Sequence, residues 1–157
     1  MQAAPQFGEP DEARAYGDRP AVFGVVEAEG RIALVRVATP GVRPWLDLPG
    51  GGVDPGETEA QALVREFGEE TGLIIRPGAC FARANQYFCK TDGQPFNNLG
   101  GFWSAGLIGA DAALKVEADH TLIWIAPREA VVALRHDAHA WAVTVWLRRV
   151  ARETLAG

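Results

Sequence analysis

The segment GGGVDPGETEAQALVREFGEETGL, from Gly50 to Leu73, carries the clearest structural signals in the chain. Thr58 has a side chain that can cap a helix N-terminus, and Gln61 follows at the spacing of a capping box. Gly72 can adopt the left-handed conformation that closes a helix C-terminus. These signals predict a helix from Glu59 to Thr71.

The predicted helix carries its carboxylates on one face. At about 100° of rotation per residue, Glu66, Glu69 and Glu70 fall together, and Glu59 lies earlier on the same side. The small side chain of Ala62 faces the same way and leaves room there. The opposite side, which we expect to dock on a sheet, consists of Ala60, Val64, Phe67 and Thr71.

A bound cation would offset the repulsion within this acidic face. Each exposed like-charge pair on a helix costs about a few tenths of a kcal/mol, and hard divalent cations such as Mg²⁺ or Mn²⁺ prefer oxygen ligands. If the cluster stood alone, a solvated acidic face would be the better interpretation. Its neighbours favour a site, because Gly50–Gly52 form a loop whose backbone can approach a ligand closely. Arg65 can also hold a carboxylate in a two-point contact.

Together these residues resemble the Nudix box. The length and fixed spacings of that motif argue against a chance match. Its defined positions correspond to Gly51, Glu57, Arg65-Glu66-Phe67, Glu69-Glu70 and Gly72-Leu73. The order of strands across residues 21–150 is also similar to the Nudix fold. The resemblance implies an α+β fold in which a mixed β-sheet is sandwiched between α-helices.

The resemblance also implies a function and a cofactor, Mg²⁺ or Mn²⁺. The carboxylates that it assigns to catalytic metal are Glu66, Glu69 and Glu70. The backbone carbonyl of Gly50 would join them, Glu57 would bind metal through water or orient the loop, and Arg65 would pair with a glutamate. The implied reaction is attack of water on a phosphoanhydride of a nucleoside diphosphate linked to a second group, X.

Outside the box, the sequence predicts one domain over residues 21–157 after a loosely structured lead-in over residues 1–20. Ala21–Val26 is a nearly continuous apolar run, which is typical of a strand covered on both faces. A short helix is expected from Pro127 to Leu134, and Asp137 can cap a last helix that reaches Thr154. Further strand-like segments are 32–37, 46–48, 73–75, 86–89, 101–107 and 122–125, with a polar loop at 90–100.

Composition and charge argue against several classes of protein. The chain is 48% hydrophobic and 22% charged, which supports a folded core. Its net charge of −5 and lack of a basic run argue against a long nucleic acid as partner. No apolar run approaches the roughly 20 residues that span a membrane, and the N-terminus lacks a signal-peptide pattern. Cys80 and Cys89 fit reduced thiols, so we expect a cytoplasmic protein without membrane attachment.

Candidates outside the box are weaker. A loop beyond the box could supply the general base or a further metal ligand, and Glu117 is our candidate, close to Asp119 and His120. The alternative is a plain polar turn. His136 and His139 could bind metal, but surface positions near a helix N-terminus fit them better. Aromatic residues that could stack on a base, although core packing explains most of them better, are Phe88, Phe96, Phe102 and Trp103.

Three functions stay open at this point. The first is a pyrophosphohydrolase acting on a small nucleotide-type substrate, as in the short nucleotide-sanitising members that the chain most resembles. The second is a non-catalytic Nudix-fold binding or regulatory module, and the third is an enzyme acting on RNA caps or 5′-triphosphate ends. The intact box favours an enzyme, and the acidic charge argues against RNA. A homodimer is left open.

Overall fold

The computed structural model describes residues 3–157 and confirms that the central apolar run is covered on both faces. This run lies in β2 (Gly17–Ala28). Because successive side chains of a strand alternate, Ala21, Phe23 and Val25 enter one core and Val22 and Val26 enter another. The strand therefore divides the molecule into two hydrophobic layers.

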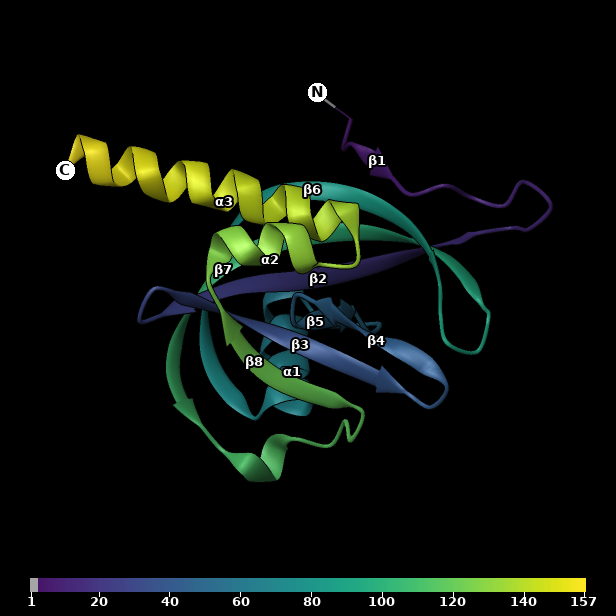
Figure 1. Cartoon of the computed structure of the whole chain (residues 1–157), viewed down its shortest axis with the longest axis horizontal. Helices are drawn as coiled ribbons and strands as arrows, with labels where there is room; N and C mark the ends of the chain where they lie inside the picture. The colour runs from purple at the N-terminus through teal and green to yellow at the C-terminus, as the bar shows by residue number, and fades with distance from the viewer. Residues whose placement is uncertain (1–2) are drawn as a thin grey trace.

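The described residues form eight strands in one curled, mixed sheet (Figure 1). The order is β1-β6-β7-β2-β3-β4, with β5 paired to β2 and β8 paired to β3. The pairs β1·β6 and β2·β7 are parallel, and the other pairs are antiparallel. The other strands are β1 (Gln6–Phe7), β3 (Arg31–Thr39), β4 (Val42–Asp47), β5 (Gly50–Gly52), β6 (Leu73–Cys89), β7 (Pro95–Ala110) and β8 (His120–Ile125).

Helices cover both faces of this sheet, as predicted. The first core holds α2 (Pro127–Ala133) and α3 (Asp137–Ala156), and the second holds α1 (Glu59–Thr71) (Figure 1). A short 3₁₀ helix, η1 (Ala112–Leu114), precedes β8. The fold class predicted from the sequence is therefore confirmed.

Local signals set the ends of α1. The Thr58 side chain accepts from the Gln61 amide, and the Gln61 side chain accepts from the Thr58 amide, so both halves of the capping box are present. Gly72 closes the helix at φ 75°, in the left-handed region. The predicted helix and both caps are confirmed.

The prediction for the docking face of α1 was right for Phe67 and Thr71, which are buried, and wrong for Val64. Val64 is 40% exposed, whereas Ala62, Leu63 and Phe67 are fully buried. The reason lies in β2, where Gly24 leaves space for the helix: a Cβ atom there would lie 2.8 Å from the Phe67 ring. The helix is thus rotated toward Leu63, and Ala62 lies in the core instead of on the acidic face.

Long-range pairing also changes three expected boundaries. Residues of the predicted lead-in join the sheet as β1 and as the start of β2 at Gly17, while residues 1–2 lie outside the described part. The predicted loop at 90–100 is shorter, because β7 begins at Pro95 and pairs with β6. Asp137 is the first residue of α3, and its N-cap is His136, which makes no side-chain capping bond.

Within residues 3–157, no helix has both the length and the apolar character needed to cross a membrane.

Candidate active site

The glycine loop lies directly against the acidic face of α1. Gly50 has φ 146°, and a Cβ atom there would collide with the Val22 carbonyl oxygen, so this position requires glycine. A Cβ atom on Gly51 would lie 2.8 Å from the Glu66 carboxyl group. The sequence GGG therefore lets the backbone approach these carboxylates closely.

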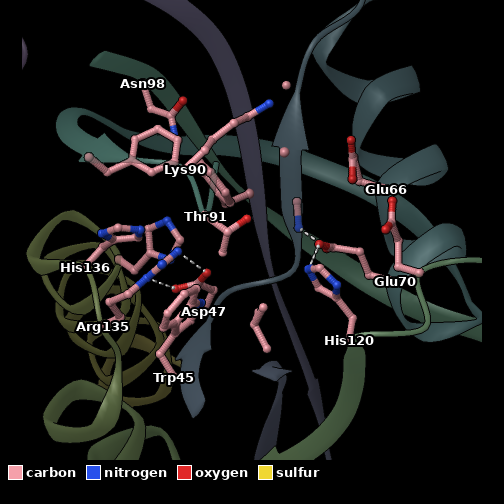
Figure 2. A pocket seen from close by; sticks show the side chains of 18 of the residues that line it. Trp45, Asp47, Glu66, Glu70, Lys90, Thr91, Asn98, His120, Arg135 and His136 are labelled. Carbon is pink, nitrogen blue, oxygen red and sulfur yellow. Dashed lines mark hydrogen bonds and ion pairs between the residues drawn. The ribbon is translucent and has the colours of Figure 1, made fainter. Parts of the chain in front are cut away.

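Glu70 is buried and hydrogen-bonded on both sides. Its Oε1 accepts from the Gly50 amide at 2.8 Å, and its Oε2 lies 3.0 Å from Nε2 of His120 (Figure 2). Nδ1 of His120 lies 2.8 Å from a carboxylate oxygen of Asp119. Burial raises the pKa of Glu70, and the hydrogen bond to Glu70 raises the pKa of His120 to about 9. His120 thus lies between the carboxylates of Glu70 and Asp119, where a positive charge on its ring would be stabilised.

Arg65 organises the remaining carboxylates. Its Nε and Nη2 donate to the two carboxylate oxygens of Glu57, each at 2.8 Å, which is the expected two-point contact. Its Nη1 lies 3.0 Å from Glu66 and 3.3 Å from Glu69, and Nη2 also donates to the Gly52 carbonyl at 3.1 Å. The hydrogen bonds from Arg65 lower the pKa of Glu57 to about 2. Arg65 therefore fastens both Glu57 and the glycine loop to α1.

The predicted metal-binding carboxylates have different environments. Glu66 lines the cleft together with Glu70, while Glu69 is half-buried and turned toward Arg65. Burial, followed by the charge of Glu70, raises the pKa of Glu66 to about 7, and Arg65 opposes this shift. Glu59, the other acidic residue of the helix, is turned away and bonds to Trp103 and Arg83.

The loop before β8 is joined to the end of α1. The backbone amides of Val116 and Glu117 both donate to the Glu69 carbonyl, at 2.9 and 3.0 Å. Side-chain ligand atoms of Glu117, Asp119 and His120 lie within 4.8 Å of one another. All three residues line the same cleft as Glu66 and Glu70. Glu117 thus lies at the site from which a base or an additional ligand could act.

A cleft of about 490 Å³ separates the acidic face from a second wall (Figure 2). Arg19 lies beside Glu66, donates from Nε to Asn98 at 2.8 Å, and lies 5.5 Å from the Phe88 ring centre. Burial lowers the pKa of Arg19, and the charge of Glu66 opposes this. The labelled residues of the second wall in Figure 2 are Trp45, Asp47, Lys90, Thr91, Asn98, Arg135 and His136.

A fixed guanidinium group forms one part of that wall. Arg135 bonds to both carboxylate oxygens of Asp47, at 2.7 and 3.2 Å, and lies 4.1 Å from the centre of the Trp45 ring. Burial raises the pKa of Asp47, while Arg135 opposes the shift. The Nε1 atom of Trp45 is buried and has no hydrogen-bond partner among the described residues. This wall therefore combines aromatic, cationic and neutral polar groups.

The prediction that His136 and His139 are surface residues was wrong. Both are buried, at 9% and 2% exposure, because they face the core from the start of α3. Nδ1 of His139 accepts from the Leu48 amide at 3.2 Å, and its ring packs 4.3 Å from that of Phe23. Burial lowers the pKa of His136 to about 3 and that of His139 well below its usual range. Both imidazoles are therefore neutral and line the cleft.

We expect the substitution His136→Phe to flatten the pH dependence of stability. In the unfolded chain His136 becomes protonated near its ordinary pKa of 6.5, whereas in the folded protein its pKa is lowered to about 3. Below pH 6.5 the unfolded state therefore binds the extra proton, and His136 lowers the free energy of unfolding as the pH falls. From about pH 6 to about pH 4, the free energy of unfolding of the variant should fall by about 1.4 kcal/mol less per pH unit than that of the wild type. Urea unfolding at each pH measures this difference. Equal slopes would mean that His136 is protonated in the folded protein.

Several residues of the second wall were missed by sequence reasoning. Arg19 fell in the predicted lead-in, although it directly precedes the apolar run of β2. Asp47 and Arg135 are far apart in the sequence and meet only through the fold. Of the aromatic candidates, Phe88 lines the cleft, whereas Phe102 is part of the buried core and Trp103 packs on the α1 side.

Known proteins resemble this chain in sequence and in fold. The family model of the NUDIX domain matches residues 17–147. An ADP-ribose pyrophosphatase from Methanocaldococcus jannaschii is 44% identical over 54 residues, which make up 34% of this chain and 32% of that protein. The match to this relative therefore spans only about a third of its length.

Solved structures of low sequence identity share the fold. A NUDIX hydrolase from Nitrosomonas europaea superposes with a TM-score of 0.70 at 21% identity, covering 83% of this chain and 89% of that one. A MutT protein from Methanosarcina mazei Go1 gives a TM-score of 0.64 at 24% identity, covering 88% and 96%. At these identities, the likeness shows the fold alone.

Proposed function

The chain belongs to the NUDIX family, and on that premise we propose that it is a metal-dependent pyrophosphohydrolase that uses water to cleave a phosphoanhydride in a nucleoside diphosphate linked to X. The observation that carries this proposal is the cleft itself. Glutamates and a glycine loop line one side, and cationic and aromatic side chains line the other, where the carboxylate of Asp47 is paired with Arg135. A small phosphorylated ligand with an aromatic or sugar group matches these two walls.

The donor set fits a hard divalent cation. Glu66 and Glu70 supply oxygen atoms that are largely withdrawn from water, with raised pKa values caused first by burial. Glu69 and the Gly50 carbonyl complete the ligand set that we propose for Mg²⁺ or Mn²⁺. Such an ion, when bound, lowers the pKa of its water and neutralises phosphate charge.

The protein's own residues position the reactants. Arg19 is held between Asn98 and Phe88 beside Glu66, so its guanidinium can bind a phosphate oxygen next to the acidic face. Arg65 and Glu57 fix the glycine loop. Glu117 is the proposed proton acceptor for the attacking water, since it lines the cleft next to the helix end. Positioning and charge stabilisation are most of what phosphoryl chemistry requires.

The second wall is the proposed site for the rest of the substrate. Phe88 offers an apolar ring, and Trp45 and neutral His136 offer rings that carry nitrogen atoms, which together suit a nucleoside. The relative named for ADP-ribose makes ADP-ribose one candidate, and small nucleoside triphosphates are the other. We also propose a cytoplasmic location, in line with the free thiols of Cys80 and Cys89.

A nucleotide panel tests the proposed function. The purified chain is incubated with Mg²⁺ and, separately, ADP-ribose, UDP-sugars, dinucleoside polyphosphates, and normal and oxidised nucleoside triphosphates, and the products are separated by chromatography. We expect a nucleoside monophosphate from at least one substrate and no turnover after chelation of the metal. A folded protein that binds nucleotides and hydrolyses none of them would support the non-catalytic alternative.

We expect Arg19→Ala to lose substrate affinity and Arg19→Lys to lose less of it. Lysine keeps the charge but cannot reproduce a planar guanidinium held by Asn98 over Phe88. KM should rise about tenfold or more in Arg19→Ala, because a hydrogen bond to a charged group contributes about 1.5–3 kcal/mol, and less in Arg19→Lys. Steady-state kinetics on the best substrate of the panel measures this. Unchanged KM in Arg19→Ala would exclude Arg19 from phosphate binding.

A further inference from the structure

Residues 4–16, here called the N-terminal arm, are anchored along the edge of the sheet (Figure 1). β1 lies within the arm and pairs in parallel with β6. The side chains of Gln6 and Asn97 exchange two amide hydrogen bonds, at 2.9 and 3.2 Å, and Asn97 is buried in β7. The ring of Phe7 packs 5.9 Å from that of Trp141 in α3. The start of the arm is therefore fixed to three elements of the domain.

The far end of the arm reaches the β6–β7 hairpin. Nη1 of Arg14 donates to the Cys89 sulfur at 3.4 Å, and Nη2 donates to the Gly93 carbonyl oxygen. Two residues later, the Tyr16 ring meets Tyr87 edge to face, with centres 5.3 Å apart. Arg14 thus connects the arm to the tip of the hairpin, and Tyr16 connects it to the end of β6 just before the turn.

This hairpin is part of the cleft. Residues 89–92 line it, and Figure 2 shows Lys90 and Thr91 on the wall opposite Glu66 and Glu70. The turn itself is closed by short-range backbone bonds, from the Lys90 amide to Gln94 at 2.9 Å and from the Gly93 amide to Lys90 at 2.8 Å. These local bonds shape the turn but do not tie its tip to the rest of the molecule. The bond from Arg14 does so.

We propose that the N-terminal arm clamps the β6–β7 hairpin over the cleft, with Arg14 as a positioning residue that holds Lys90 and Thr91 where they bind substrate. The consequence for catalysis rests on the proposed function, because Lys90 and Thr91 would contact the phosphorylated substrate. Arg14 itself lies outside the cleft lining and acts through the hairpin backbone. Without the clamp, the hairpin tip would open, and substrate binding would weaken while the chemistry of the opposite wall stays intact.

Hydrogen exchange and steady-state kinetics of Arg14→Ala test this clamp. Arg14→Lys is the conservative variant, since an ammonium group can still donate to the Gly93 carbonyl. Arg31→Ala, at the exposed first residue of β3, is the matched control for loss of one positive charge. In metal-free, substrate-free protein, we expect faster amide exchange in residues 88–96 for Arg14→Ala, and exchange like that of the wild type for Arg14→Lys and Arg31→Ala. In Arg14→Ala, KM should rise about tenfold with kcat unchanged, as expected for loss of a charged hydrogen bond. In Arg14→Lys, KM should return most of the way to the wild-type value.

Unchanged exchange in residues 88–96 would overturn the clamp, whether or not any substrate is turned over. Faster exchange with a KM equal to that of Arg31→Ala would also overturn it, because Arg14 would then not position the substrate-binding wall. A parallel drop in kcat and in melting temperature would indicate general structural damage and would contradict the positioning role. If the wild type hydrolyses nothing in the panel, the proposed function fails, while the exchange comparison still decides whether the arm holds the hairpin.

Discussion

Glu66→Gln should reduce kcat by about 10²-fold or more, equivalent to about 2.7 kcal/mol of transition-state stabilisation, while the metal-free protein stays as stable as the wild type. Glu66 is largely buried, lies against Gly51, and is repelled by Glu70. Replacing its charge with an amide removes a proposed metal ligand and also removes that repulsion. The amide oxygen can still accept from Arg65. Thermal unfolding in chelator and kinetics with Mg²⁺ measure the two effects separately.

Glu59→Gln is the matched control on the same helix. Glu59 accepts from Trp103 at 3.0 Å and from Arg83 at 2.9 Å, on the side of α1 away from the cleft. We expect this variant to keep its turnover and to lose some stability. The reverse outcome, with Glu66→Gln active but unstable, would mean that the acidic face is structural.

Glu117→Gln should lower kcat by about 10²–10⁴-fold, the range typical of lost acid–base catalysis. Its carboxylate lies with Asp119 and His120 at the cleft, and its backbone is bonded to the Glu69 carbonyl at the end of α1. The affinity for metal should barely change, since the helix carboxylates remain. Mn²⁺ titration and kcat measured on the same preparations test both statements.

A normal rate in Glu117→Gln would contradict the assignment of the base. If Glu57→Gln were then strongly impaired, the base or its water-holding partner would lie inside the box. Glu57 bonds to Arg65 through both carboxylate oxygens and already has a pKa lowered to about 2. Because both oxygens of Glu57 already accept from Arg65, whereas Glu117 lines the cleft, we favour Glu117.

The features that sequence reasoning predicted correctly depend on local signals. The capping box at Thr58 and the left-handed Gly72 mark both ends of α1 within a few residues. The apolar run in β2 already indicates a strand covered on both faces. The two-point contact of Arg65 with a carboxylate was expected from the residue type, and the structure identifies the partner as Glu57.

The features that could not be predicted from the sequence depend on contacts between distant segments. Arg19 joins the cleft because β2 pairs with β7 from Gly17 onward, and the polar residues there carry no strand signal of their own. His120 contacts Glu70 because β8 pairs with β3. The register of this pairing places His120 opposite Val37 and so fixes the position of His120. The docking face of α1 depends on the space above Gly24, which the helical period alone does not specify.

Hydrolysis in ¹⁸O-labelled water with Mg²⁺ shows whether water attacks the phosphoanhydride with the help of a metal ion. We predict that the wild type cleaves a nucleoside-diphosphate-linked substrate and places one labelled oxygen on a single phosphate product. Chelator should abolish the reaction, and Glu66→Gln should slow it by about 10²-fold. Label-free products, or label incorporation that continues unchanged in chelator and in Glu66→Gln, would contradict a metal-assisted attack of water at this cleft.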